Sequence, residues 1–284
     1  MDIITHHYTQ VNGIQIFYRE AGPKDAPILL LPHGYPCSSF QYRNLMAALS
    51  DRWRLVAPDF PGFGYSDTPQ DFEYTFDGYA QFLQDFCQSL SLKRYSLYLH
   101  DYGSQIGLRL AMSAPENITS LIIQNGDIYE DALGPKYDGL KEYWRNPSPE
   151  NHKKLEDAVS KEGFREEFIG ETDQKLHNRF TPDLWNLAAS QLLTPERHKI
   201  MVGLMEGLKQ NLGWMPKAQA YLREHKPATL IVWGPQDGYM PEKSAKAYLR
   251  DLPNAELRLL NGGHWLLETH LDEVAALVRD FLDR

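Results

Sequence analysis

Asp101 lies in the stretch "LYLHDYGSQIG", where a short aliphatic run ends and a glycine-containing helical pattern begins. A turn between a strand and a helix often presents a reactive side chain, and a carboxylate there is already ionised at neutral pH. It can attack a saturated carbon directly, without the adjacent base that a serine needs, and the product is an ester. Two other residues suited to such chemistry, Asp237 in "WGPQDGYMPE" and His264 in "NGGHW", also follow apolar runs.

Each of these residues also has an ordinary structural explanation. Asp101 could cap a helix, because aspartate favours that position, while Asp237 could be a turn residue and His264 a loop histidine. Asp127, after "TSLIIQNG", is a rival acid, although a turn residue is the simpler interpretation. The order Asp, Asp, His at the ends of apolar runs, together with the loop "PHGYP", favours one shared site.

The segments that must position these residues alternate between strand and helix patterns. Asn12-Gly13 between two β-rich runs predicts a hairpin. Helical patterns such as "FDGYAQFLQDFCQSL" separate several continuous apolar runs that are typical of strands buried on both faces. These runs are "PILLLPHG", "RLVAPDFPG", "YSLYLHD", "TSLIIQNG", "ATLIVWG" and "AELRLLNGG". The alternation predicts an α/β fold with a mostly parallel sheet between helices, whose ligands bind beyond the carboxyl ends of the strands.

The alternation stops after Asp127 and resumes near Pro227. The intervening segments have helical patterns and no convincing strand, as in "LKEYWR", "PENHKKLEDAVSKEGFREEF", "PDLWNLAASQLL" and "PERHKIMVGLMEGLKQNL". We therefore predict a helical cap over the strand ends, formed by residues 128–213 and inserted between two parts of the core, 1–127 and 214–284.

Composition limits the partners. The 284 residues include enough hydrophobic side chains, 42%, for a large core, and the net charge of −9 argues against binding nucleic acid. No apolar stretch is long enough to span a membrane, and the N-terminus does not have the pattern of a secretion signal. The two cysteines, Cys37 and Cys87, require no disulfide framework. We expect a cytoplasmic monomer or homodimer that acts on a small-molecule substrate with water, and no cofactor or metal.

The motifs "HGYP", "APDFPGFGYSDTP", "LHDYGS", "VWGPQD" and "GGHW" resemble the epoxide hydrolase and haloalkane dehalogenase branch of the α/β-hydrolase fold. The resemblance covers most of the core and is weak across the cap. It implies an eight-stranded, mostly parallel sheet and a hydrolase that works through an aspartyl ester. Asp101 would be the nucleophile, Asp237 the acid and His264 the general base, while the backbone N–H groups of Tyr35 and Tyr102 would form the oxyanion hole.

Within this branch, dehalogenases usually hold the halide with a tryptophan after the nucleophile, and many add an asparagine in the "HG-x-P" loop. Here those positions are Tyr102 and Tyr35. Tryptophans of the cap could substitute; these are Trp144, Trp185 and Trp214.

Epoxide hydrolases keep an aromatic residue in the "HG-x-P" loop, as at Tyr35, and use cap tyrosines that donate to the epoxide oxygen. Tyr143 is the first candidate for this role and Tyr137 the second, whereas Leu208 stands where the second tyrosine is expected. The resemblance therefore favours an epoxide hydrolase acting on small to medium apolar substrates, with a haloalkane dehalogenase as the alternative. A non-catalytic ligand receptor with this fold is a third hypothesis.

Overall fold

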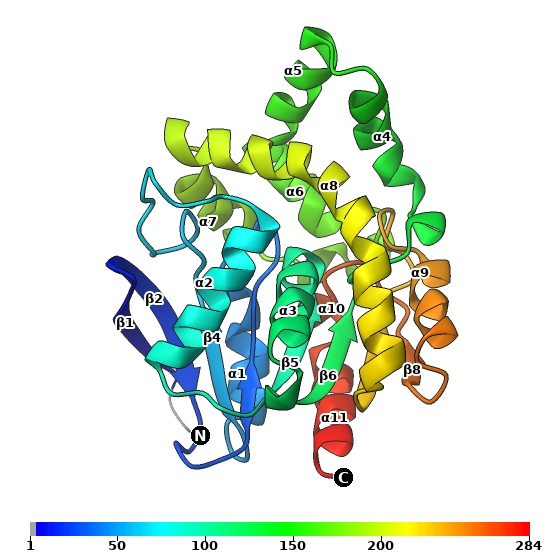
Figure 1. The fold of residues 1–284 in the computed structure, drawn as a ribbon. Helices are drawn as coiled ribbons and strands as arrows, with labels where there is room; N and C mark the ends of the chain where they lie inside the picture. The colour runs from blue at the N-terminus through cyan, green and yellow to red at the C-terminus, as the bar shows by residue number, and fades with distance from the viewer. Residues whose placement is uncertain (1–3) are drawn as a thin grey trace.

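The six apolar runs form six adjacent strands of one eight-stranded sheet in a computed structural model that describes residues 4–284 (Figure 1). The spatial order of the strands is β1-β2-β4-β3-β5-β6-β7-β8. The strands are β1 (Thr5–Val11), β2 (Ile14–Ala21), β3 (Ile28–Leu30), β4 (Arg54–Pro58), β5 (Tyr95–His100), β6 (Ile118–Gln124), β7 (Thr229–Trp233) and β8 (Glu256–Leu259). Only β2 pairs antiparallel with its neighbours β1 and β4, so the prediction of a mostly parallel sheet is confirmed.

The predicted hairpin is also confirmed. Asn12 and Gly13 join β1 to β2, and both have positive φ angles, 51° and 82°. Asparagine and glycine tolerate this left-handed conformation better than other residues do, which explains the turn at this point of the chain.

Helices cover both faces of the sheet because successive strand residues point to opposite sides. Leu29 of β3 packs in the core under α1 (Arg43–Leu49) and α11 (Leu271–Leu282), whereas Leu30 packs in the core under α2 (Phe76–Ser89) and α3 (Asp101–Ser113). The short helices α9 (Glu242–Ala247) and α10 (Leu266–Thr269) follow β7 and β8. No helix within residues 4–284 is both long and apolar enough to cross a membrane.

Between β6 and β7, five further helices form a lid at the end of the sheet away from the two termini (Figure 1). They are α4 (Asp138–Arg145), α5 (Pro149–Ala158), α6 (Lys161–Ile169), α7 (Asp183–Leu192) and α8 (Pro195–His225). Thr194 caps α8, whose 31 residues run without a break from the lid back along the core and pack on α3. The boundary that we expect between residues 213 and 214 falls inside this helix.

Candidate active site

Asp101 is the first residue of α3, directly after β5, and its backbone has a φ of +51°. This left-handed angle at a residue with a side chain is characteristic of a strained turn. Two glycines allow the close packing around it. A Cβ on Gly103 would lie 2.1 Å from the carbonyl oxygen of Pro32, and one on Gly34 would lie 2.6 Å from the Cβ of Asp101. The loop after β3 therefore runs directly against the Asp101 side chain.

The carboxylate of Asp101 has two distinct ends. Its Oδ1 accepts a hydrogen bond of 2.6 Å from the backbone N–H of Tyr35, and its Oδ2 lies 3.5 Å from Nε2 of His264. Burial alone would raise the pKa of Asp101, but the hydrogen bond and charge of His264, together with the backbone N–H of Tyr102, hold it below the usual value. The group is therefore ionised, and the carboxylate does not cap α3.

His264 connects Asp101 to Asp237. Its Nδ1 lies 2.6 Å from Oδ2 of Asp237, so the N–H at this position donates to the carboxylate. The other oxygen, Oδ1, accepts the backbone N–H groups of Tyr239 and Met240 at 2.8 and 3.0 Å. Burial alone would lower the pKa of His264, but the two carboxylates raise it to about 10. The imidazole is thus charged in this state and fixed in orientation.

Asn125, which we did not identify from the sequence, links the turn at Asp101 to the loop of Asp237. Its side-chain N–H group donates to Oδ2 of Asp237 at 2.9 Å, and its side-chain oxygen accepts the N–H of Gly234 at 2.9 Å. Its backbone oxygen accepts the N–H of Asp101 at 3.1 Å. Asn125 directly follows β6, and the same reasoning about strand ends that led to Asp127 could have found it.

His100 is a second residue that the sequence reasoning missed. Gln41 donates to its Nδ1 at 2.8 Å, so Nε2 carries the proton and donates to the backbone oxygen of His264 at 3.0 Å. Burial lowers the pKa of His100 to about 3, and the ring is neutral. The neutral ring of His100 thus holds the backbone of His264, whose own ring is charged.

Asp127, the rival acid, does not contact His264. It is 1% exposed, and its Oδ1 accepts a hydrogen bond of 3.0 Å from Gln105. Burial raises the pKa of Asp127 to about 6. The structure therefore brings Asp237, and not Asp127, to the imidazole.

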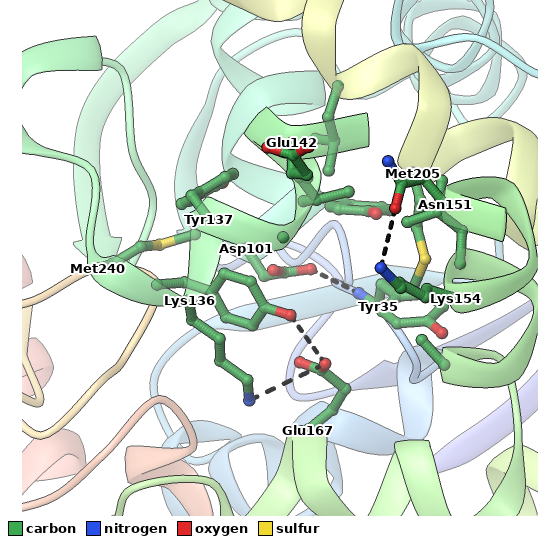
Figure 2. A pocket seen from close by; sticks show the side chains of 17 residues that line it. Tyr35, Asp101, Lys136, Tyr137, Glu142, Asn151, Lys154, Glu167, Met205 and Met240 are labelled. Atoms are coloured by element: carbon green, nitrogen blue, oxygen red, sulfur yellow. Dashed lines mark hydrogen bonds and ion pairs between the residues drawn. The ribbon is translucent and has the colours of Figure 1, made fainter. Parts of the chain in front are cut away.

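A cavity of about 250 Å³ lies between the lid and Asp101 (Figure 2). Its wall combines four phenols, an aliphatic part and a polar part. The phenols are those of Tyr35, Tyr102, Tyr137 and Tyr239. The main aliphatic residues are Leu140, Leu155, Ala158, Met205 and Leu208, and the polar residues are Asp101, Lys136, Glu142, Asn151, Lys154 and Glu167. The site thus places an ionised carboxylate in a mostly apolar space.

Of the two lid tyrosines that we considered, only Tyr137 lines this cavity. Tyr143, our first candidate, does not, because its hydroxyl donates to Glu206 of α8. The cap tryptophans Trp144, Trp185 and Trp214 are also absent from the lining, whereas Leu208 is part of it. The structure therefore places Tyr137, and not Tyr143, at the cavity, since a contact between two lid helices holds the Tyr143 hydroxyl.

Comparison with known proteins agrees with this architecture. A family model described as "alpha/beta hydrolase fold" matches residues 27–271. An uncharacterized hydrolase of Saccharomyces cerevisiae, YNR064C, is 32% identical and the match covers 96% of this chain and 95% of that protein. Haloalkane dehalogenase 2 of Mycobacterium tuberculosis is 28% identical, with coverage of 93% and 90%.

Among solved structures, the epoxide hydrolase CorEH superposes with a TM-score of 0.81 at 19% identity, and the match covers 99% of both chains. Such a likeness concerns the fold. The family match and the Saccharomyces cerevisiae relative show that the chain is a hydrolase of the α/β-hydrolase family, and its similarity to haloalkane dehalogenase 2 agrees with the branch that the motifs indicate.

Proposed function

We propose that this protein hydrolyses its substrate through a covalent ester on Asp101, and that the substrate is an epoxide of small to medium size. The observation that carries this proposal is the position of one carboxylate: Asp101 lines the cavity while its two oxygens meet a backbone N–H of the Tyr35 loop and the imidazole of His264. In this arrangement Asp101, His264 and Asp237 act as nucleophile, general base and supporting acid.

In the first step, Oδ2 of Asp101 attacks a ring carbon of the epoxide. The carbon–oxygen bond of the ring breaks, and its electron pair stays on the oxygen, which takes a proton from a donor in the cavity. Tyr137 is the lid tyrosine that lines the cavity, and we assign this role to its hydroxyl, which also interacts with the neighbouring carboxyl group of Asp127. The product is an ester between Asp101 and the substrate, which now carries a hydroxyl group.

Before the second step, the imidazolium of His264 releases its proton and the phenolate of Tyr137 takes one up, so that the imidazole is neutral. His264 then takes a proton from water, and the oxygen of that water attacks Cγ of Asp101. Negative charge then develops on Oδ1, where the N–H of Tyr35 already donates at 2.6 Å and the N–H of Tyr102 assists. A donor of this kind stabilises the transition state by roughly 3 kcal/mol. The intermediate collapses by breaking the bond between Cγ and the oxygen attached to the substrate, and this oxygen receives the proton from His264. The diol leaves, and the remaining proton of the new carboxyl group passes to His264, which restores the ionised Asp101 and the charged imidazole.

Haloalkane dehalogenation is the second candidate, supported by the names of several relatives. The lining favours the epoxide. It offers phenol protons to a ring oxygen, whereas none of the three cap tryptophans, which could donate an indole N–H to a halide, lines the cavity. The third possibility is a ligand receptor without turnover. Ligand binding alone would not require an imidazole held between two carboxylates, so the position of His264 favours an enzyme.

Two assays run in parallel on purified protein separate these functions: diol formation from epoxides, and halide release from haloalkanes of similar size. Diol formation without halide release is expected. Halide release alone would favour the second candidate, and specific binding of these compounds without any turnover would favour the receptor.

The covalent step has its own test. His264→Gln should still form the ester but hydrolyse it very slowly, because the base is gone. Intact mass spectrometry should then show a protein heavier by the mass of the substrate, with the modification on the peptide that contains Asp101. Asp101→Asn is the control and should remain unmodified. Unmodified His264→Gln, after long incubation with a substrate that the wild type turns over, would contradict covalent catalysis.

A further inference from the structure

The cavity contains a second carboxylate that the mechanism does not use. Glu167, on α6, lines the same space as Asp101 (Figure 2). Its Oε1 accepts a hydrogen bond of 3.0 Å from the hydroxyl of Tyr239 and lies 4.0 Å from Nζ of Lys136. The side chain of Glu167 is 20% exposed. It is therefore a partly desolvated acceptor that faces the place where substrate binds.

Glu167 is fixed relative to both catalytic loops. The indole N–H of Trp265, next to His264, donates to the backbone oxygen of Glu167 at 2.8 Å. The hydroxyl of Tyr239 donates to the side chain of Glu167. Tyr239 lies two residues after Asp237, and its backbone N–H donates to the carboxylate of Asp237. The carboxylate cannot move far from the cavity without breaking these contacts.

The charge of Glu167 is only partly compensated. Lys136 lies 4.0 Å from Glu167 and also 4.0 Å from Glu171, so the two carboxylates share one ammonium group. Burial raises the pKa of Glu167, while the charge of Lys136 and the hydroxyl of Tyr239 oppose that rise. Among residues 4–284, no group donates a hydrogen bond to Oε2. That oxygen is left for whatever occupies the cavity.

We propose that Glu167 determines substrate specificity: its free oxygen accepts a hydrogen bond from a hydroxyl or ammonium group of the substrate and disfavours substrates that carry a carboxylate. This inference rests on the proposed function, because it takes Asp101 as the reacting group of the same cavity. The substrate class is then an epoxide on a short aliphatic chain that also carries a hydroxyl or amino group.

The charges in the cavity support this class. The cavity of about 250 Å³ is lined by three carboxylates and two ammonium groups, Asp101, Glu142, Glu167, Lys136 and Lys154. An anionic substrate would add a fourth carboxylate beside the two that are least exposed, Asp101 and Glu167. In a partly desolvated site, like charges repel far more strongly than in water. A donor group meets an acceptor instead, and the chain between it and the epoxide can contact the aliphatic wall around Leu155 and Met205.

Binding of three matched probes tests the inference without relying on turnover. Calorimetry or NMR titration would give the Kd of hexylammonium, hexan-1-ol and hexanoate for the wild type and for Glu167→Gln. We expect the wild type to bind hexanoate most weakly. In Glu167→Gln the ratio of the hexanoate Kd to the hexylammonium Kd should fall by at least about tenfold.

Glu142→Gln is the matched control, because Glu142 lines the outer part of the same cavity with a side chain that is 52% exposed. It should change the ratio only slightly, since solvent screens its charge. If Glu167→Gln does not fold, as judged by its thermal melt, Lys136→Gln gives a test of opposite sign. Removing the ammonium group should make the discrimination against hexanoate stronger.

The inference is overturned if the wild type binds hexanoate as tightly as hexylammonium, or if Glu167→Gln shifts the ratio no more than Glu142→Gln does. The kinetic counterpart compares kcat/KM for an alkyl epoxide and its hydroxyl and carboxylate derivatives. A shifted binding ratio with no diol from any epoxide would leave Glu167 as the selective residue and refute the epoxide hydrolase. Diol formation with an unchanged binding ratio in Glu167→Gln would support the epoxide hydrolase and refute the role of Glu167 in selectivity.

Discussion

The protonation state of the His264 imidazole depends on the charge of Asp101, whose ester the imidazole is proposed to hydrolyse. With Asp101 and Asp237 both ionised, the pKa of His264 is raised to about 10, and at neutral pH the imidazole cannot accept a proton from water. Ester formation removes the charge of Asp101 and with it part of the field that holds this proton. Ester formation therefore lowers the pKa of His264, so that the imidazole loses its proton and becomes available as a proton acceptor only after the nucleophile has reacted.

Asp101→Asn imitates the charge of the ester, so it should lower the pKa of His264 well below 10. The direction follows because a neutral neighbour no longer stabilises the imidazolium. An NMR titration of the histidine ring signals measures this directly. Asp127→Asn, which removes a strand-end carboxylate without contact to His264, should shift the same pKa much less. Equal shifts in the two variants would show that Asp101 does not control the base.

The same variants test the pH dependence of stability. The pKa of His264 is raised from 6.5 to about 10 in the folded protein, so its ion pairs stabilise the fold fully below pH 6.5. This contribution is lost as the pH rises towards 10. Urea unfolding of the wild type between pH 6.5 and 10 should show the loss, and Asp101→Asn should show less of it.

At the scale of secondary structure, the start of the lid separates two tyrosines that look equivalent in the sequence. Tyr137 ends a short 3₁₀ turn, Pro135–Tyr137, which is tied to the loop of Asp237 because Gly238 accepts the N–H of Lys136 at 3.1 Å. Tyr143 lies on α4 and points its hydroxyl to Glu206 of α8. The first is thereby fixed near the active site, and the second joins two lid helices.

This difference predicts opposite outcomes for two identical substitutions. Tyr137→Phe should slow ester formation on an epoxide by roughly 10²-fold, the lower end of general acid catalysis, because the ring oxygen loses its proton donor. Tyr143→Phe should leave this rate nearly unchanged. Single-turnover kinetics measures the step in both proteins. A slow Tyr143→Phe beside a normal Tyr137→Phe would mean that the lid rearranges before reaction.

The strands and the hairpin could be predicted because they depend on neighbours in the sequence: Asn12-Gly13 forces a turn, and a run such as "YSLYLH" can only be buried. Asp101, Asp237 and His264 could be identified because parallel strands end at one edge of the sheet. The lid residues could not be placed. Tyr143 and Glu206 are 63 positions apart, and only the packing of α4 on α8 brings them together. The role of Glu167 likewise depends on Tyr239 and Trp265, which come from other segments.

Considered as a whole molecule, the lid is continuous with the core. One helix, α8, supplies cavity residues such as Met205 and Leu208 at its lid end and packs on α3 further along. Near its start, Arg197 donates to the backbone oxygens of Gly64 and Ser66 at 2.8 and 2.7 Å. The wall of the cavity is thus anchored to a core loop by one guanidinium group.

Replacing this anchor should loosen the lid more than the core. Arg197→Gln loses charge-assisted hydrogen bonds to three carbonyl groups, those of Gly64 and Ser66 in the core and that of Gln191 in the lid, a cost of about 2–3 kcal/mol. Hydrogen exchange followed by mass spectrometry should show faster exchange in α7 and the first turns of α8, with β5 unchanged, and kcat/KM should fall because Met205 and Leu208 lose their fixed positions. Lys199→Gln, an exposed substitution on the same helix, is the control and should behave as the wild type. If exchange in Arg197→Gln rises equally in β5 and α8, the lid has no separate stability, and the fold loosens as one cooperative unit.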